Sequence, residues 1–478
     1  MRPDWSLTFT IEEFGAKAIL LNQMNGRTAI TGNASAKRML SYAAGASVEW
    51  LVAITVGILV CGSLLAPQSG AAWQASMWRG GSLVLALALV VVLKFNVARA
   101  GPFIVIFASW LFVVAIGAIA RIGQTDSLNE LIRHIYMIGI GALTYQACGS
   151  KIGSSIVRKF IWFTLVAIAI ICIALVPDVM SGGWSWDKAR VYKAVSLSER
   201  GIGFNSLILI MVVALVTLAK SSKAVTWVWI TAFGVMLASS FLFATRAPFV
   251  SMAVAWAAVA AYSLHIRLGN QSVTRFGATA LAVIGLALPL VALALIVSDP
   301  ASPLARFGAG RIALWQISIA VWQENPIFGA GPNALMFGAQ EFLNIGSFTA
   351  HYERNSILNL SGGGFHNLWL DTLASKGLIG LIGLLISYFL LLRTGLLRAA
   401  DPQAMPFVIL LFILLTRSFV EVSGQYGYQN SPLDLVVMIA IAATMRDAIA
   451  PIVWQENEAR PEKFKRLWRV RRLNQPYA

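Results

Sequence analysis

Three basic side chains of this 478-residue chain have the types and positions needed for chemistry on an anionic substrate. Arg246 falls between two apolar runs and has no acidic neighbour in the sequence. An unpaired guanidinium is costly to bury at a membrane boundary, so such a residue usually faces a cavity or a ligand. We therefore expect Arg246 to bind an anionic lipid head group. The alternative is that its side chain only reaches outward to bulk head groups.

The second basic residue, Arg311, opens a stretch with helical periodicity. Ile312, Trp315, Ile319 and Trp322 fall on one face of that stretch, which predicts an amphipathic helix on the membrane surface. The dipole of a helix disfavours a cation in its first turn, where Arg311 lies. That position favours a role for Arg311 in binding a ligand.

The third residue, His366, follows the triple glycine of residues 362–364 and precedes an apolar helical pattern. The glycines are expected to act as a hinge. A histidine at the head of a helix beside a hinge is well placed for proton transfer. The alternative is a histidine that only caps the helix or forms a structural hydrogen bond.

The rest of the chain has the composition of a membrane protein. Hydrophobic residues make up 58% of it and charged residues only 12%, which excludes an ordinary soluble domain. Apolar runs near the length of a bilayer span recur about twelve times. The expected spans are Ala44–Ala66, Trp73–Leu93, Pro102–Ala120, Glu130–Cys148, Phe160–Val176, Gly201–Ala219, Ala224–Ala244, Ala247–Ile266, Gly277–Val297, Gly377–Leu392, Pro406–Val420 and Leu433–Met445. We therefore predict an all-α polytopic membrane protein.

This pattern divides the chain into five parts. Residues 1–43 form a cytoplasmic N-terminal segment, and residues 44–297 hold spans one to nine. Residues 298–376 form a large polar helical cap between spans nine and ten, which carries Arg311 and His366. Residues 377–448 hold the last three spans, and residues 449–478 form a basic tail.

The basic residues predict the orientation and the partners. With both termini cytoplasmic, roughly 24 of the 37 Lys and Arg residues lie inside, as the positive-inside rule requires, so the cap lies outside. The net charge of +16 then favours anionic membrane lipids, and we expect no nucleic-acid partner. The chain lacks a Cys, His and Asp cluster at ligand spacing, so we expect neither a metal site nor a cofactor.

Four sequence features, in this order, resemble the superfamily of O-antigen ligases and O-antigen polymerases, which are bacterial membrane glycosyltransferases. They are Thr245-Arg246, the segment from Gly310 to Trp315, the turn from Glu324 to Asn333, and His366-Asn367-Leu368-Trp369-Leu370 followed by Gly377-Leu378-Ile379-Gly380. Ala247-Pro248 departs from the small residue or glycine that the superfamily more often has after the arginine. The resemblance covers about the central third of the chain.

The resemblance implies a GT-C fold in the bacterial inner membrane and an active site on its periplasmic face. The implied donor is a glycan linked to undecaprenyl diphosphate, transferred with inversion and without a metal. The implied catalytic residues are Arg246 and Arg311 on the diphosphate and His366 as the base. Secondary contacts with the diphosphate or the glycan are expected from Arg190, Arg200, Trp315 and Asn367.

Several alternative functions remain, and most of them differ in the molecule that accepts the glycan. The set of Arg246, Arg311 and His366 resembles the ligase pattern, which favours lipid A–core as acceptor. A polymerase would instead use a second lipid-linked glycan and build O-antigen or exopolysaccharide. A protein O-oligosaccharyltransferase is a less favoured member of the same class. A transporter or flippase, from another class, would account for the spans, but we find no two similar halves in the sequence.

Overall fold

The structure of the chain is a computed structural model. It describes residues 49–58, 80–90, 97–121, 125–185, 204–218, 251–255, 312–332, 367–398, 403–419 and 434–449, with the single positions 227, 230, 231, 234, 238, 257, 334 and 401. The chain divides into two compact units, Met1–Val52 and Ala53–Ala478. Everything that follows concerns the second unit.

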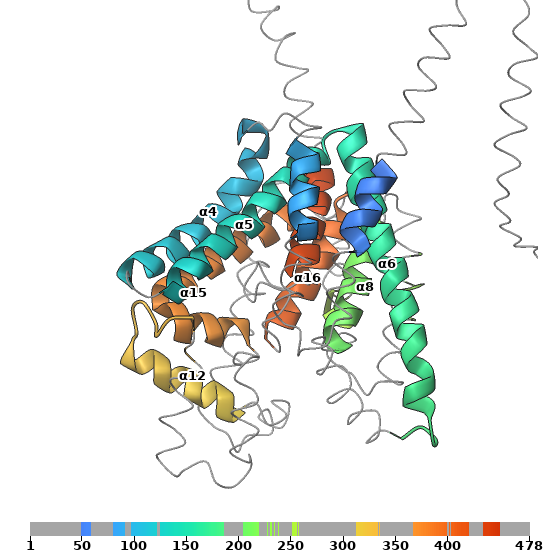
Figure 1. Cartoon of the computed structure of the whole chain (residues 1–478). Helices are drawn as coiled ribbons and strands as arrows, with labels where there is room; N and C mark the ends of the chain where they lie inside the picture. The colour runs from blue at the N-terminus through green and yellow to red at the C-terminus, as the bar shows by residue number, and fades with distance from the viewer. Residues whose placement is uncertain are drawn as a thin grey trace, which may run out of the picture. The chain divides into compact units, whose positions relative to one another are not determined.

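The described residues form helices and no strands, as the sequence predicts. Figure 1 shows the labelled helices gathered into a bundle, with α12 beyond one end of it. Their bounds are α4 Val97–Ala120, α5 Thr125–Ala147, α6 Lys151–Met180, α8 Phe204–Leu218, α12 Ile312–Glu324, α15 Leu368–Leu396 and α16 Met405–Ser418. Residues 434–449 are also helical, as are the shorter stretches Glu49–Ile58 and Gly80–Val90.

Three of the described helices are long and apolar enough to cross a membrane, namely Ala100–Ala120, Ile152–Ile170 and Leu368–Leu396. This supports a membrane protein, while the total of about twelve spans stays a prediction. The expected spans seven, eight and nine lie almost wholly outside the described residues. Some helices extend beyond the predicted spans: α6 begins at Lys151 rather than at Phe160, and α15 begins at Leu368, one arm before the predicted span start at Gly377.

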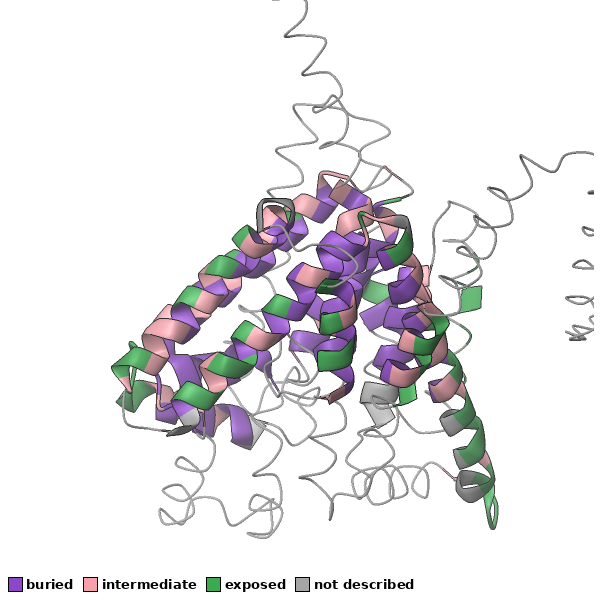
Figure 2. Cartoon of the chain, turned by 45° about the horizontal axis from the view of Figure 1, so that its top comes forward, coloured by how far each residue is buried: buried purple, intermediate pink, exposed green. Residues whose placement is uncertain are grey.

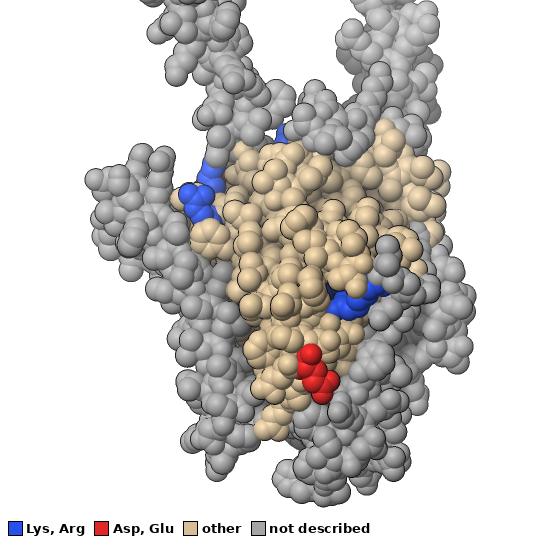
Figure 3. Space-filling model, turned by 90° about the vertical axis from the view of Figure 1, so that its left-hand side faces the viewer, with Lys and Arg blue, Asp and Glu red and all other residues tan. Residues whose placement is uncertain are grey.

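The large apolar side chains that stay exposed follow helical spacing. On α4 they are Val105, Phe112 and Ile119, seven residues apart, and on α15 Leu378, Ile382 and Ile386, four apart. Residues at these spacings share one face of a helix. Figure 2 shows exposed residues along the outer sides of helices whose inner sides are buried, and Figure 3 shows a face with few charged groups. These faces suit contact with lipid acyl chains.

Helices α4, α5 and α15 form the tightest part of the bundle. Gly383 of α15 faces α4 so closely that a Cβ atom added there would overlap the side chain of Val113. Beside it, the hydroxyls of Ser109 and Ser387 lie 3.0 Å apart, and Ser387 Oγ donates to the carbonyl oxygen of Ile106 at 3.2 Å. Small residues and interhelical hydrogen bonds are the usual means of packing helices in a membrane.

Contacts at the two ends of the bundle join residues that the predicted topology places on the same side of the membrane. At one end, Trp369 Nε1 donates to Ser418 Oγ at 2.8 Å, which ties the start of α15 to the end of α16. At the other end, the Arg446 guanidinium lies 5.2 Å from the centre of the Tyr145 ring. Which end faces outward stays a prediction.

Candidate functional site

Most of the residues proposed from sequence lie outside the part of the chain that the structure describes. These are the catalytic candidates Arg246, Arg311 and His366 and the secondary candidates Arg190 and Arg200. Trp315 and Asn367 are described, and Asn367 directly follows His366. The candidate site is therefore built from the residues that surround the beginning of α15.

Asn367 is the N-cap of α15, and both the oxygen and the nitrogen of its side chain have partners inside the protein. Its carbonyl oxygen Oδ1 accepts from the backbone N–H of Leu370 at 3.0 Å. Its amide Nδ2 donates to the carbonyl oxygen of Phe419 at 3.1 Å, just after α16. Asparagine is among the strongest N-cap residues because it satisfies one of the free N–H groups of the first turn. Asn367 is also completely buried, so its side chain anchors the start of α15 inside the protein.

Trp315 packs α12 against the first part of α15. It belongs to a buried cluster with Leu314, Ile317 and Val321 of α12 and with Leu370, Leu373 and Ala374 of α15. Ser318 adds a hydrogen bond from its hydroxyl to the carbonyl oxygen of Leu370 at 2.8 Å. The helix predicted from Arg311 onward is confirmed from Ile312 to Glu324. The face that it buries meets α15, and Trp315 lies in that interface.

Helix α15 is made of two arms joined by a sharp kink at Gly377, whose φ and ψ are 66° and −163°. The first arm runs from Leu368 to Lys376, and the second continues to Leu396. The kink falls at the residue where the apolar run begins in the sequence. Figure 1 shows the two arms of α15, with α12 close to the first of them. The backbone conformation of Gly377 lies in a region that is open essentially only to glycine.

The turn between Asn325 and Gly331 fits against this kink and forms what we call the interlock. Ala330 N donates to Ala374 O at 2.7 Å, and Gly331 N donates to Ser375 O at 2.9 Å. On the other side of the kink, Leu378 N donates to Pro326 O at 2.9 Å and Ile379 N to Ile327 O at 3.3 Å. The kink leaves backbone N–H and C=O groups of α15 without partners inside the helix. Backbone groups of the turn form hydrogen bonds with them instead.

Two glycines make the interlock sterically possible. Gly329, with φ at 68°, lies against the backbone of Lys376, and Gly377 lies against the backbone of Ile327. A Cβ atom at either position would overlap backbone atoms of the other segment. These glycines belong to the two sequence motifs that lie about fifty residues apart and carry part of the family resemblance. The structure brings those two motifs into direct contact.

Arg121, in the short connection after α4, holds the interlock from the side. Its guanidinium Nη2 donates to the carbonyl oxygens of Phe328 and Gly329 and, at 3.3 Å, to that of Ser375. Burial lowers the pKa of Arg121, and the nearby carboxylate of Glu130 opposes that change. An arginine stays protonated despite such a shift. A single cation therefore binds carbonyls from both halves of the interlock.

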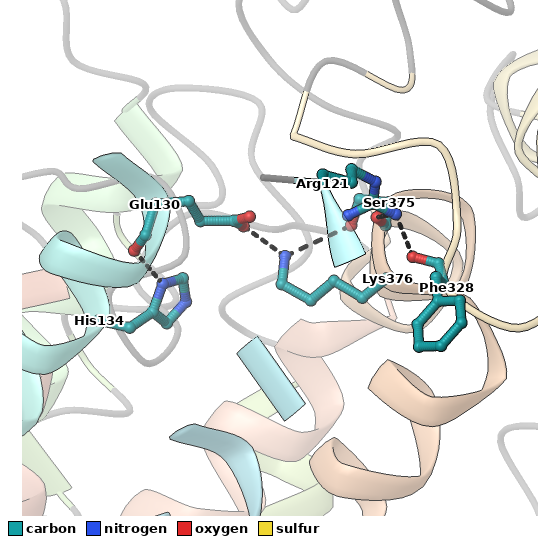
Figure 4. Close-up of polar contacts among 6 residues, drawn as sticks. All are labelled: Arg121, Glu130, His134, Phe328, Ser375 and Lys376. Atoms are coloured by element: carbon teal, nitrogen blue, oxygen red, sulfur yellow. Dashed lines mark hydrogen bonds and ion pairs between the residues drawn. The ribbon is translucent and has the colours of Figure 1, made fainter. Parts of the chain in front are cut away.

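Glu130 of α5 and Lys376 form a buried ion pair beside the kink (Figure 4). Lys376 Nζ lies 2.5 Å from Glu130 Oε1 and 5.6 Å from the centre of the Trp110 ring on α4. One turn along α5, His134 Nδ1 donates to the carbonyl oxygen of Glu130 at 2.9 Å. His134 is fully buried, and its Nε2 has no hydrogen-bond partner among the described residues. Charged, aromatic and backbone groups from α4, α5 and α15 therefore meet at one point.

Sequence reasoning did not single out Arg121, Glu130 and Lys376. The available signal was that each is a charged residue at the end of a predicted span, where an unpaired charge is costly. Their pairing could not be read from the sequence, since Glu130 and Lys376 are 246 positions apart. Through these residues the first arm of α15 and the neighbouring turn are bonded to α5 and to the connection after α4.

Among the described residues, no group of three or more His, Cys, Asp and Glu side chains could hold a metal ion. A comparison of the chain with models of protein families finds no match, and a comparison with curated proteins finds none either. The family resemblance therefore rests on the sequence motifs alone.

Proposed function

We propose that this protein is a membrane glycosyltransferase of the O-antigen ligase type. In this proposal it has a GT-C fold in a bacterial inner membrane, with about twelve spans and both termini in the cytoplasm. It transfers a glycan from undecaprenyl diphosphate to lipid A–core at the periplasmic face. The observation that carries the proposal is the interlock, in which the turn from Asn325 to Gly331 meets the kink at Gly377, at the far end of the helical arm that begins after Asn367.

The proposed reaction is a displacement with inversion at the anomeric carbon. The acceptor hydroxyl oxygen forms a bond to that carbon as the bond from the carbon to the diphosphate oxygen breaks. The bonding electron pair leaves with the undecaprenyl diphosphate, and the hydroxyl proton passes to the imidazole of His366. Arg246 and Arg311 bind the diphosphate and stabilise its growing negative charge, which guanidinium groups do well through paired hydrogen bonds. The proposed reaction uses no metal ion.

The geometry around Asn367 supports a catalytic place for His366. Asn367 is held at both ends of its side chain, by the first turn of α15 and by the end of α16. The residue before an N-cap is adjacent to the positive end of a helix dipole. A base held there by a capped and buried helix start meets the need for a well-positioned catalytic group.

The test is donor turnover by the full-length protein in lipid nanodiscs, with no ion gradient. Undecaprenyl diphosphate released from a lipid-linked glycan is measured in the presence of lipid A–core. We expect turnover by the wild type, loss of at least about 100-fold with His366→Ala, and full activity with the control His351→Ala. Equal activity of His366→Ala and the wild type would show that His366 is not the catalytic base.

Complementation separates the acceptors. The gene is expressed in one strain that lacks its O-antigen ligase and in another that lacks its polymerase, and lipopolysaccharide is examined on a gel. Restored attachment to lipid A–core supports the ligase. Restored chain length without attachment moves the assignment to the polymerase. Movement of the lipid-linked glycan across a vesicle membrane without its cleavage would favour a transporter instead.

A further inference from the structure

The ion pair of Glu130 and Lys376 lies where it controls the direction of the first arm of α15. Lys376 is the last residue of that arm, directly before the kink at Gly377. Its side chain is 4% exposed and that of Glu130 is 15% exposed, so the pair is almost wholly buried. Glu130 belongs to α5, which is part of the bundle and not of the interlock.

A buried ion pair is poor evidence for added stability. Removing two charges from water costs about as much as their attraction returns, and apolar replacements of both partners are often neutral or stabilising. Such a pair can instead specify one geometry, since it is strong only when both groups meet at the right distance. The pair of Glu130 and Lys376 is the described side-chain ion pair that ties the arm to α5.

The first arm is held at both ends, by the ion pair at its pivot and by the contacts of Asn367 and Trp369 with the end of α16, so a change at the pivot strains the contacts at its start. Residues 368–376 rise about 1.5 Å each, so the arm is roughly 13 Å long from the kink to its first residue. A change of about 10° at the pivot would displace the start of the arm by roughly 2 Å. A displacement of about 1 Å can lower a catalysed rate about 100-fold, so the direction of this arm matters for a base at its head.

We propose that Glu130 and Lys376 are positioning residues, whose ion pair sets the direction of the first arm of α15 and thereby the place of His366. The interlock joins the arm to the turn from Asn325 to Gly331, and the pair joins that assembly to α5. Arg121 adds a second connection, through the carbonyl oxygens of Phe328, Gly329 and Ser375. The part of the proposal that concerns His366 rests on the function proposed above.

The test uses the full-length protein with Lys376→Met, which keeps most of the length of the unbranched side chain and removes its charge. Hydrogen exchange, measured by mass spectrometry, reports on the backbone N–H groups of Ala330, Gly331 and Leu378. We expect faster exchange in peptides that cover residues 325–331 and 368–380 and unchanged exchange in α16. In the turnover assay we expect kcat to fall about 10- to 100-fold while the KM for the donor changes less than about twofold.

Three further variants make the result decisive. Glu130→Gln with Lys376→Met leaves no unpaired charge from the pair, so it is expected to fold even if the single variant does not. It should show the same exchange and kcat changes. Lys376→Arg keeps the charge and should restore most of kcat. Arg398→Gln removes an ion pair with Asp401 at the far end of α15 and should change neither measurement.

Unchanged exchange in the interlock of the double variant would overturn the proposal. So would faster exchange with an unaltered kcat, because His366 would then not depend on the arm. If the wild type turns over no donor, the function proposed above fails by itself. Hydrogen exchange still decides in that case whether the pair holds the arm.

Discussion

At the residue scale, Asn367 forms structural hydrogen bonds that tie the start of α15 to its neighbours. Asn367 was predicted from its motif to contact the diphosphate or the glycan. Its side chain forms hydrogen bonds with Leu370 N and Phe419 O inside the protein, and its contact with a substrate stays a prediction. A side chain whose donor and acceptor both have buried partners has little left to offer a ligand. Asn367 therefore anchors the start of α15 to the end of α16.

Replacing Asn367 should lower stability more than it lowers donor affinity. Asn367→Ala removes an N-cap and leaves the Phe419 carbonyl oxygen without its partner, a loss of about 1–3 kcal/mol in the free energy of unfolding. Asn367→Asp keeps the cap and should lose less of the N-cap stabilisation. Unfolding of the detergent-purified protein measures the loss. A rise of more than about tenfold in the donor KM with unchanged stability would contradict this role.

The two glycines of the interlock should tolerate no side chain. Gly377→Ala places a Cβ atom against the backbone of Ile327 in a conformation that costs about 1–3 kcal/mol for a residue other than glycine, and the overlap adds to that. We expect loss of at least about 2 kcal/mol in the free energy of unfolding. Gly139→Ala in α5 is the matched control, since no atom lies within 4 Å of its Cβ position. Equal stability of the two variants would contradict the close approach.

At the element scale, the two arms of α15 differ in their surroundings. The second arm, from Leu378, has the exposed apolar face of a membrane helix. The first arm is buried against α12 and the end of α16. Gly377 separates the two arms because its conformation ends one helix direction and begins another. The base proposed at the head of α15 is thus carried by the arm that packs inside the protein.

The contact between α12 and the first arm depends strongly on Trp315. Trp315→Ala would leave a cavity among Leu314, Leu370 and Leu373 and should cost about 3–5 kcal/mol in the free energy of unfolding. Phe328→Ala, at an exposed position of the turn, is the control and should cost less than about 1 kcal/mol. Unfolding of the purified proteins compares them. A small loss with Trp315→Ala would mean that α12 is held mainly by its hydrogen bonds.

At the scale of the whole molecule, charged groups meet at both ends of the bundle. Arg121, Glu130 and Lys376 gather at the end beside the interlock, while Arg446 lies over Tyr145 at the other. Between them lie long faces of exposed apolar residues. This distribution suits a protein whose middle lies in lipid and whose two ends meet water and head groups.

The predicted orientation can be tested with single cysteines in a variant that lacks Cys61, Cys148 and Cys172. Glu324→Cys, at the end of α12, lies on the predicted outer side, and Gln403→Cys, before α16, lies on the inner side. A membrane-impermeant maleimide should label Glu324→Cys in cells with a permeabilised outer membrane. Gln403→Cys should react only after the inner membrane is opened. The reverse pattern would invert the topology.

Several features of the fold could be predicted from the sequence because they depend on local composition. The apolar runs around α4, α6 and α15 are long enough to fill a bilayer, and helices are the structure that satisfies their backbone there. The helix from Ile312 was predicted from its periodicity. A helix after Asn367 was also predicted and is confirmed from Leu368, but its sharp kink at Gly377 was not, since that kink depends on the turn that packs against it.

By itself, the sequence determined that the chain is helical and rich in membrane-length apolar runs, and it marked the two glycine-containing motifs. Only the tertiary structure decided that those motifs interlock, that Asn367 caps and Trp315 packs, and that Glu130 meets Lys376. The physical reason is the distance along the sequence over which each interaction acts. Hydrophobicity and helix periodicity are properties of neighbouring residues, whereas an ion pair across 246 positions and two glycine backbones in contact exist only after the helices pack.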